Sequence, residues 1–293
     1  MNVSAATAGE LDAALRLLVG HRPPADRGSA IQRYRDLIAS GDLDPAGIFV
    51  ARGATRKPVG AMLVSVMPGA LGLAWPPVAN RRKRIETEDA LVAAACSWLR
   101  SRGVKVCQAF GDGMDALERA GFRNLTSLLE LRRELHDTPP PIRRLAFEPL
   151  SVANRDAFFA MLLATFDGSL DCPEVNGTRT ATELLATYID MPPVSWHLVR
   201  RGDEPVGVVL LNAAAGSPVC ELTYLGLAPK FRRAGYGSEL VSFARITARN
   251  SGRLTLVLSV DERNRPARRL YETHGFQASG ARSVFLADWP AIS

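Results

Sequence analysis

Cysteine and histidine are scarce in this sequence, and neither occurs in a pattern that binds metal or forms a disulfide framework. The 293 residues include four cysteines and four histidines, with no C-x-x-C pair and no metal-ligand spacing. A zinc site of known spacing and a disulfide-stabilised fold are therefore not expected. We predict no metal cofactor and free, buried thiols at Cys96, Cys107, Cys172 and Cys220.

Long apolar runs are also absent. No stretch approaches the ~18 uninterrupted apolar residues of a membrane span, and the N-terminus lacks a basic segment followed by an apolar core and a small-residue cleavage site. With 47% hydrophobic and 23% charged residues, the composition is that of a soluble globular protein long enough for two cores. We expect a cytoplasmic protein with two domains and no membrane partner.

Positive charge is not concentrated enough to indicate nucleic acid binding. The net charge is +6 and the pI is near 9.4, which is a small excess for this length. Only residues 81–84, Arg-Arg-Lys-Arg, form a dense basic run, and no aromatic residues interleave with it to stack on bases. We expect this run to be a solvated loop or a contact for a phosphorylated small molecule, and we expect no nucleic acid partner.

The sequence does contain a glycine loop between an apparent strand and a helix. Residues 232–237 read Arg-Arg-Ala-Gly-Tyr-Gly; residues 222–227 are typical of a strand, and residues 238–250 of a helix. Glycines two apart let the backbone approach an anion, and the N–H groups and the positive end of the helix then point at a phosphate. Glycines in this arrangement also occur in plain strand-to-helix turns, so the context decides.

A second motif follows at a set distance. After an apolar run at 254–260, residues 264–276 read Asn-Arg-Pro-Ala-Arg-Arg-Leu-Tyr-Glu-Thr-His-Gly-Phe. Together the motifs resemble the GNAT superfamily of acyl-coenzyme A-dependent N-acyltransferases, whose signature is [Q/R]-x-x-G-x-[G/A] at the head of a helix, then an Asn and an L-Y-x-x-x-G-F close. The resemblance covers residues 145–290, approximately, and every motif position is filled: Arg232, Gly235, Gly237, Asn264, Ala267, Leu270, Tyr271, Gly275 and Phe276.

This resemblance implies a fold and a co-substrate. GNAT domains have a mixed β-sheet flanked by helices, in which two parallel strands splay apart to admit the pantetheine arm of acetyl-coenzyme A. The resemblance further implies that the strand end binds the thioester and pantetheine amides through its backbone, while the glycine loop holds the pyrophosphate. The cofactor-binding residues implied are Leu225, Gly226, Leu227, Arg232, Arg233, Ala234, Gly235, Tyr236, Gly237, Ser238 and Asn264.

Direct acetyl transfer to an amine needs a group that accepts the amine proton and one that protonates the departing thiolate. Glu221 begins the strand that leads into the glycine loop, where several GNAT enzymes carry a glutamate base, and it is also compatible with a solvent-facing strand end. The motif context places the Tyr271 hydroxyl near the leaving sulfur in the family, the alternative being a packed aromatic. We predict Glu221 as base and Tyr271 as acid.

An acidic loop follows the first helix of the second half. Residues 167–174 read Asp-Gly-Ser-Leu-Asp-Cys-Pro-Glu, in the region that often covers the acceptor in GNAT domains. Its carboxylates would recognise a cationic amine, so Asp171 and Glu174 are predicted substrate-binding residues. Acidic loops are also commonly just solvated.

An internal repeat divides the chain. Leu-Gly-Leu-Ala at 71–74 recurs at 225–228 and Gly-Phe at 121–122 recurs at 275–276, with equal offsets of 225 − 71 = 154 and 275 − 121 = 154. Consecutive prolines at 139–141 favour an extended connector. We therefore predict a GNAT-like domain at 1–136, a proline-rich linker at 137–143 and a catalytic GNAT domain at 144–293.

The 154 offset indicates that the first copy has lost its chemistry. It sets Arg81 and Lys83 against the two glycines of the loop, Met67 against Glu221, and Leu117 against Tyr271. Arginine and lysine add bulk where the backbone must approach phosphate, and neither Met67 nor Leu117 transfers protons. The first domain is therefore expected to be non-catalytic.

Hydrophobic periodicity agrees with two α/β domains. Helices are predicted at 10–19, 30–39, 88–101, 154–165, 182–189 and 238–250, with a short one near 270. Strands are predicted at 47–52, 59–66, 104–110, 196–200, 206–212, 221–227, 254–260 and 283–286. The expected fold class is α/β, as two tandem domains that each have a central mixed sheet flanked by helices.

The sequence thus predicts a tandem GNAT N-acetyltransferase that uses acetyl-coenzyme A on a small-molecule or peptide amine. One alternative is an enzyme like mycothiol synthase, also a tandem GNAT, which acetylates the amine of a cysteinyl sugar. Another is a module that binds coenzyme A without turnover. The acceptor, the length of the acyl group, any ligand of the first domain and the oligomeric state stay open.

Overall fold

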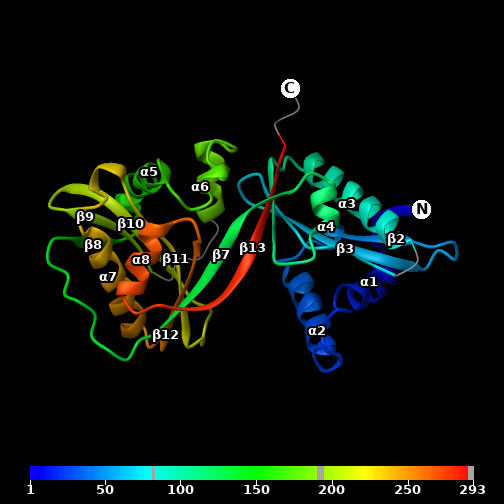
Figure 1. Cartoon of the computed structure of the whole chain (residues 1–293), viewed down its shortest axis with the longest axis horizontal. Helices are drawn as coiled ribbons and strands as arrows, with labels where there is room; N and C mark the ends of the chain where they lie inside the picture. The colour runs from blue at the N-terminus through cyan, green and yellow to red at the C-terminus, as the bar shows by residue number, and fades with distance from the viewer. Residues whose placement is uncertain (81–82, 190–194, 290–293) are drawn as a thin grey trace. The chain divides into compact units, whose positions relative to one another are not determined.

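The structure, a computed structural model, describes residues 1–80, 83–189 and 195–289. The chain packs into two compact units: a first unit of Met1–Leu125 together with Ser283–Ser293, and a second unit of Thr126–Arg282. The β-strands of each unit have helices on both faces (Figure 1), which confirms the predicted α/β class. No helix in the described part of the chain combines the length and hydropathy that a bilayer span requires.

In the first unit the sheet has the order β1-β2-β3-β4-β6-β13, with β5 paired to β3. All its pairings are antiparallel except that of β4 with β6. The strands are β1 (Asn2–Ala5), β2 (Ile48–Arg52), β3 (Pro58–Met67), β4 (Leu71–Ala74), β5 (Val78–Ala79), β6 (Val106–Phe110) and the end of β13 (Gln277–Asp288). The helices are α1 (Leu11–Leu18), α2 (Pro24–Ser40), α3 (Arg84–Ser101) and α4 (Asp115–Arg119), with 3₁₀ turns at Ala8–Glu10 and Pro45–Gly47.

In the second unit the strands follow the order β7-β12-β11-β10-β9-β8; among these neighbours in the described residues, β11 and β12 are parallel and the other pairs are antiparallel. The strands are β7 (Arg123–Glu134), β8 (Ala146–Pro149), β9 (Ser195–Arg201), β10 (Glu204–Asn212), β11 (Val219–Leu227) and β12 (Thr255–Asp261). The helices are α5 (Arg155–Phe166), α6 (Ala181–Ile189), α7 (Tyr236–Asn250) and α8 (Arg265–Thr273), with 3₁₀ turns at Val152–Asn154, Pro173–Val175 and Pro229–Phe231.

Alternation along the central strands builds a core on each face of both sheets. Because successive side chains of a strand point to opposite faces, Ile48 and Val50 of β2 pack with α1, while Phe49 and Ala51 pack with α3. The second unit repeats this division: Val208 and Leu210 of β10 pack with α5, and Val209 and Leu211 with α7. The four cysteines are free, and all but Cys172 are buried.

The last strand of each half belongs to the sheet of the other unit. Strand β7 pairs with β12 from Leu128–Asp261 to Glu134–Thr255, and the end of β13 pairs with β6 from Val284–Phe110 to Asp288–Val106. The compact units are therefore divided at 125/126 and 282/283, whereas the sequence analysis divided the chain at residues 137–143. The proline-rich connector lies inside the second unit, after β7.

The internal repeat is supported at its C-terminal end. Strands β7 and β13 are both 12 residues long, and both of their ends are 154 positions apart (277 − 123 and 288 − 134). In the turn before each strand, the N–H of Phe122 donates to the Leu117 carbonyl, and that of Phe276 to the Tyr271 carbonyl, both at 3.0 Å. Leu117 therefore stands where Tyr271 does, as predicted.

The 154 offset fails earlier in the chain. The β4–β6 ladder begins at Leu71–Val106, and the β11–β12 ladder begins at Val219–Thr255. Leu71 therefore corresponds to Val219, an offset of 148, so the Leu-Gly-Leu-Ala match at 71–74 is wrong as a structural equivalence. Met67 does not occupy the place of Glu221, because β4 puts Leu73 there. Lys83 (φ 59°) precedes α3 as Gly235 (φ 79°) precedes α7, so Lys83 matches Gly235 and not Gly237. Arg81 lies outside the described residues.

Two truncations test the division into units. A fragment of residues 126–282 keeps β7 beside β12, whereas a fragment of residues 139–293 loses it and exposes the edge of β12 over seven register pairs. An unpaired apolar strand edge promotes aggregation. We expect the 126–282 fragment to unfold cooperatively when followed by circular dichroism and the 139–293 fragment to aggregate. A soluble, cooperatively unfolding 139–293 fragment would show that β7 is dispensable.

Candidate active site

Strands β11 and β12 separate part of the way along. Their parallel ladder consists of Val219–Thr255, Cys220–Leu256 and Glu221–Val257, after which β11 continues to Leu227 and β12 to Asp261. No register pair in the described chain joins the two strands beyond this point. The edge of β11 from Leu222 onward is therefore open on the side of β12, which is the splay that the GNAT resemblance implies.

A β-bulge lies at the base of this splay. Leu210 of β10 pairs with Tyr224 but Leu211 pairs with Leu222, so Thr223 is the extra residue on β11. Its hydroxyl Oγ1 is buried and has no hydrogen-bond partner within the described chain. Bulges re-aim backbone and side-chain groups, and here the bulge occurs where a ligand between the strands would be bound.

The glycine loop lies where β11 leads into α7. Arg233 (φ 63°) and Gly235 (φ 79°) have left-handed backbone, and α7 begins at Tyr236 with no side-chain N-cap. The first N–H groups of a helix have no partner within it, so they are open to an anion at this end. A Cβ on Gly237 would lie 3.0 Å from Leu270, so this glycine also allows α8 to pack closely on α7.

Arg232, the first residue of the glycine motif, directs its side chain to backbone carbonyls. Nε donates to Leu227 O at 2.9 Å, Nη1 to Gly168 O at 2.9 Å, and Nη2 to Thr165 O at 2.9 Å and Asp167 O at 2.7 Å. The guanidinium thus connects the end of β11 to the end of α5 and the acidic loop.

Asn264 forms the N-cap of α8. Its Oδ1 accepts the Ala267 N–H at 3.2 Å, and its Nδ2 donates to the Asp171 carboxylate at 3.1 Å. Both polar atoms of the side chain therefore have partners within the chain. The cap fixes the start of the short helix that carries Tyr271.

Two tyrosines of the second unit differ in whether their hydroxyl groups donate a hydrogen bond within the chain. Thr165 Oγ1 lies 2.6 Å from Leu162 O and 2.9 Å from the Tyr224 hydroxyl; since Thr165 donates to the carbonyl, Tyr224 donates to Thr165. The Tyr271 hydroxyl has no hydrogen-bond partner in the described chain. Burial, with the nearby Asp171 and Tyr224 groups, raises the pKa of Tyr271 well above its usual value, so it keeps its proton at neutral pH.

Glu221 occupies the last position of the β11–β12 ladder. The residue is exposed, and its carboxylate has no ion-pair partner in the described chain. It lies at the opposite end of β11 from the glycine loop, at the point where the strands separate. An exposed, unpaired carboxylate is compatible both with proton acceptance from a bound amine and with simple solvation.

The acidic loop is attached to the end of β12. The Asp171 carboxylate accepts the Asp261 N–H at 3.0 Å as well as the Asn264 amide, and Glu174 forms an ion pair with the Arg263 guanidinium. Desolvation by burial raises the pKa of Asp171. Both predicted substrate-binding carboxylates therefore have partners in the chain, and an acceptor amine would have to share or displace them.

Asp261 is the centre of this attachment, and no sequence motif pointed to it. Its side chain is fully buried and accepts from Thr126 Oγ1 at 2.7 Å, from the Cys172 N–H at 3.0 Å and from Arg263. Burial alone raises the pKa of Asp261, but the hydrogen bonds from Arg263, Thr126 and the backbone outweigh it and lower the pKa to about 2. The ionised carboxylate thus joins β7, β12 and the acidic loop.

The first unit has a related arrangement without the open strand edge. Strands β4 and β6 also pair over three positions, ending at Leu73–Gln108. The Gly60–Ala79 pair corresponds to Gly207–Leu227, which puts Pro76 and Pro77 at the places of Tyr224 and Leu225. Because proline has no N–H, this edge cannot donate hydrogen bonds as β11 can.

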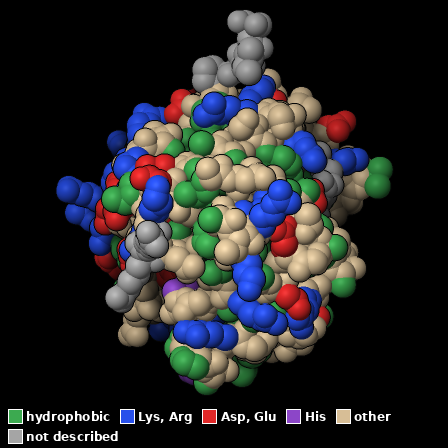
Figure 2. All heavy atoms as spheres, turned by 90° about the vertical axis from the view of Figure 1, so that its right-hand side faces the viewer, with side chains coloured by type: hydrophobic (Ala, Val, Ile, Leu, Met, Phe, Trp, Pro, Cys, Tyr) green, Lys and Arg blue, Asp and Glu red, His purple; other side chains and the backbone are tan. Residues whose placement is uncertain are grey.

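Carboxylates also lie at the head of α3. Glu88 is buried there and pairs with Arg84 at 2.7 Å and Arg119 at 3.9 Å, in a hollow of about 500 Å³ that Glu86 and Asp115 also line. Lys83, Arg84 and Arg119 also line this hollow, so the cations at the start of α3 are already paired with carboxylates. Figure 2 shows lysine and arginine side chains on the face that it displays, with aspartate and glutamate side chains among them.

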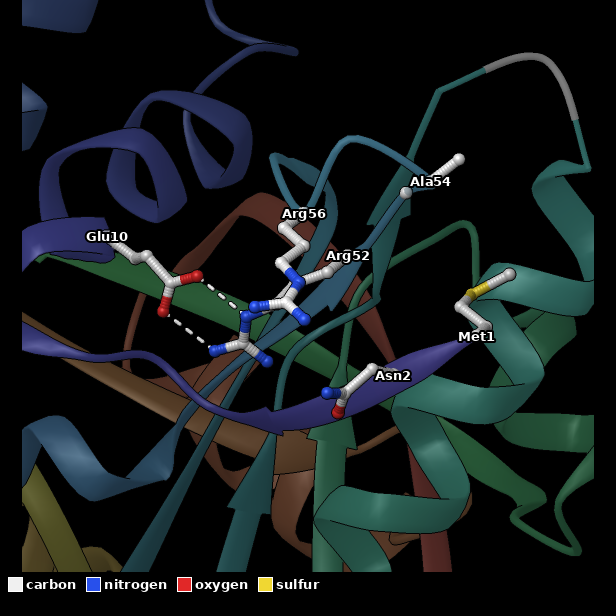
Figure 3. Close-up of a pocket in the computed structure, with 7 residues that line it drawn as sticks. Met1, Asn2, Glu10, Arg52, Ala54 and Arg56 are labelled. Carbon is white, nitrogen blue, oxygen red and sulfur yellow. Dashed lines mark hydrogen bonds and ion pairs between the residues drawn. The ribbon is translucent and has the colours of Figure 1, made fainter.

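A second hollow of the first unit, of about 660 Å³, contains an ion pair. Figure 3 shows the Arg52 guanidinium facing the Glu10 carboxylate, with two contacts of 2.7 Å. The hydrogen bond from Arg52 is the main cause that lowers the pKa of Glu10 to about 2. No group of three or more candidate metal ligands occurs among the described residues.

Comparison with known families identifies the second unit. Residues 162–276 match the family model described as Acetyltransferase (GNAT) family. A mycothiol acetyltransferase of Thermomonospora curvata is 31% identical over 189 residues, covering 60% of this chain and 61% of the relative, and one of Acidothermus cellulolyticus is 29% identical over 189 residues, covering 57% and 56%. The chain therefore matches less than two thirds of the length of these relatives.

Solved structures resemble the whole chain. A GCN5-related N-acetyltransferase from Sphaerobacter thermophilus has a TM-score of 0.64 at 17% identity, covering 100% of this chain and 97% of that one. The tandem GNAT protein from the clavulanic acid biosynthesis pathway has a TM-score of 0.53 at 13% identity and covers 98% of each chain. At these identities the likeness establishes the fold alone, and it extends over both units.

The Asp261 network predicts a pH-dependent stability. The pKa of about 2 in the folded protein lies below the ordinary 3.8, so the stabilisation is complete above pH ~4 and is lost as the pH falls toward ~2. We expect Asp261→Asn to lower the free energy of unfolding by about 2 kcal/mol at pH 7 and by less at pH 3. Urea unfolding of both proteins at the two pH values measures this.

The matched control is Glu262→Gln, an exposed neighbour of Asp261, which we expect to leave the free energy of unfolding unchanged at both pH values. Equal destabilisation by Asp261→Asn at pH 7 and pH 3 would contradict the role of the ionised carboxylate.

Proposed function

We propose that the second unit, whose residues 162–276 match the GNAT acetyltransferase family model, transfers an acetyl group from acetyl-coenzyme A to a primary amine. The observation that supports this most is the opening of the β11–β12 ladder after Glu221–Val257, beside the left-handed glycine loop at the head of α7. These two features would bind the two ends of one ligand, a pantetheine arm and a pyrophosphate.

In this proposal acetyl-coenzyme A is bound chiefly by backbone groups. The open edge of β11 at Leu225, Gly226 and Leu227 would pair with the pantetheine amides and the thioester carbonyl, and the N–H groups of 233–238 would hold the pyrophosphate. A Cβ on Gly226 would lie 2.7 Å from Thr165, so only glycine allows α5 to lie this close to the strand.

The proposed chemistry is direct transfer. The amine nitrogen attacks the thioester carbonyl, a C–N bond forms and the C–S bond breaks. Glu221 takes the proton that the amine loses, and the Tyr271 hydroxyl gives its proton to the departing thiolate. Tyr271 suits this role better than Tyr224, because the Tyr224 proton is already donated to Thr165.

The acceptor is proposed as a small-molecule or peptide amine near the acidic loop. Asp171 and Glu174 would attract its positive charge, which requires that they exchange part of their contacts with Asn264 and Arg263. The named relatives favour one particular candidate, the amine of a cysteinyl sugar as in mycothiol synthesis. Incubation of the protein with acetyl-coenzyme A and a panel of amines, followed by mass spectrometry of the products, tests the class and this candidate together.

The catalytic assignment predicts different effects for the two tyrosines. We expect Tyr271→Phe to lower kcat by about 100-fold with little change in affinity for acetyl-coenzyme A, because the thiolate loses its proton donor. Tyr224→Phe is the matched control and is expected to lower kcat by less than ~10-fold. We also expect Glu221→Gln to remove or shift the acidic limb of the pH–rate profile. Equal losses in the two tyrosine variants would argue for a packing role of both rings.

The first unit is proposed to bind no coenzyme A, because prolines replace the open strand edge and the cations at the head of α3 are already paired with carboxylates. We expect calorimetric titration to give about one coenzyme A per chain. Gly235→Glu should abolish binding through bulk, backbone strain and charge, while Lys83→Glu, at the equivalent position of the first unit, should leave it unchanged. Two bound molecules per chain would overturn this assignment.

A further inference from the structure

Arg232 connects the cofactor loop to the acidic loop, although sequence reasoning assigned it only to cofactor binding. Its four hydrogen bonds end on carbonyls of β11, α5 and the segment that follows α5, at 2.7 to 2.9 Å. The next residue, Arg233, begins the left-handed backbone of the glycine loop. A single side chain therefore joins the site proposed for the pyrophosphate to the start of the region proposed for the acceptor.

Three of the carbonyls that Arg232 binds lie at the C-terminal end of α5 and just after it. The last C=O groups of a helix have no N–H to accept within it, and α5 ends at Phe166 with Asp167 in extended conformation. The guanidinium accordingly caps α5 from a different element, through the carbonyl of Thr165 in its last turn and those of Asp167 and Gly168, which follow the helix. A lysine has a single ammonium group in place of the planar fork and cannot reach all of these acceptors in one geometry.

The far end of the same segment is attached to the end of β12 and the start of α8. We call residues 167–175 the strap. Beyond Arg232, the strap is attached through Asp171 to Asn264 and Asp261, and through Glu174 to Arg263. Between these attachments Leu170 is 49% exposed. The strap thus runs from the head of the glycine loop to the head of α8, and it carries both carboxylates proposed for the acceptor.

We propose that Arg232 is a positioning residue that couples occupation of the glycine loop to the order of the strap. This inference rests on the proposed function, since it takes coenzyme A as the ligand of the loop. A pyrophosphate bound to the N–H groups of 233–238 fixes the backbone on which Arg232 sits, and the fixed guanidinium then holds the end of α5 and the strap. By linkage, an ordered strap favours coenzyme A equally.

Hydrogen exchange of the full-length protein, with and without saturating coenzyme A, tests this coupling. We expect coenzyme A to slow amide exchange across residues 167–175 by about 5-fold or more in the wild type. In Arg232→Met this slowing should be lost, and in Arg232→Lys, which keeps the charge, it should be reduced. The KM for the amine should rise in both variants by more than the Kd for coenzyme A.

Lys230→Met is the matched control, because this exposed residue precedes the loop and its ammonium group contacts Glu204 and the ring of Phe231, not the strap. We expect it to keep the wild-type slowing of exchange. If Arg232→Lys binds coenzyme A and retains the full slowing, the guanidinium fork is not the coupling element and the inference is wrong. If Arg232→Met loses coenzyme A affinity but not the slowing at saturation, Arg232 is a phosphate ligand instead.

Failure of the proposed function and failure of the role proposed for Arg232 give different results. A wild-type protein that gives no titration with coenzyme A would overturn the proposed function. A wild-type protein that binds coenzyme A but shows unchanged exchange across the strap would overturn only the role of Arg232.

Discussion

The second unit depends on the place where a parallel β-ladder stops. After Glu221–Val257 the two strands no longer pair, and the free edge of β11 is the feature from which the rest of the site follows. Two glycines make this geometry sterically possible: a Cβ on Gly207 would lie 2.3 Å from the Gly226 carbonyl, and one on Gly226 would collide with Thr165. The bulge at Thr223 lies between the ladder and these glycines. Opening the sheet leaves backbone groups unpaired, which a folded protein tolerates where a ligand or water pairs with them.

Much of this arrangement was predictable from local sequence, because its determinants are local. The glycine loop, the N-cap Asn264 and the L-Y-x-x-x-G-F turn each lie within a few residues of chain, and the structure has the expected loop, helix starts and α/β layers. Strand β7 was not predicted, because its leucines do not alternate strictly with polar residues. Its partner β12 also lies far away in the sequence, since Glu134 pairs with Thr255. The Leu-Gly-Leu-Ala repeat gave a wrong equivalence, because a four-residue identity carries no information on strand register. The pairing of β4 with β6 and of β11 with β12 decides which residues correspond.

Side-chain direction was the part of the site that sequence could not supply. The motif predicted Arg232 and Asn264 as cofactor-binding residues, and only the fold shows that one guanidinium turns to α5 and that one amide turns to Asp171. Asp261 and Arg263 belong to no motif, since their role depends on Thr126 and Cys172, which are far away in the chain. Charge-assisted hydrogen bonds of this kind are set by tertiary structure, and a carboxylate in a sequence gives no sign of them.

The placement of β13 also constrains how the chain folds. The sheet of the first unit is completed by Val284–Asp288 pairing with Val106–Phe110, so its last ladder joins residues more than half the chain apart. Contacts of such long range close slowly, because a large loop must be ordered before they form. During synthesis β6 therefore remains an unpaired edge until nearly all described residues have been made, and the first unit cannot finish folding ahead of the second. A cut at the midpoint of the chain therefore separates strands from the ladders that they complete, and neither half obtained in this way is a module that can be exchanged between proteins.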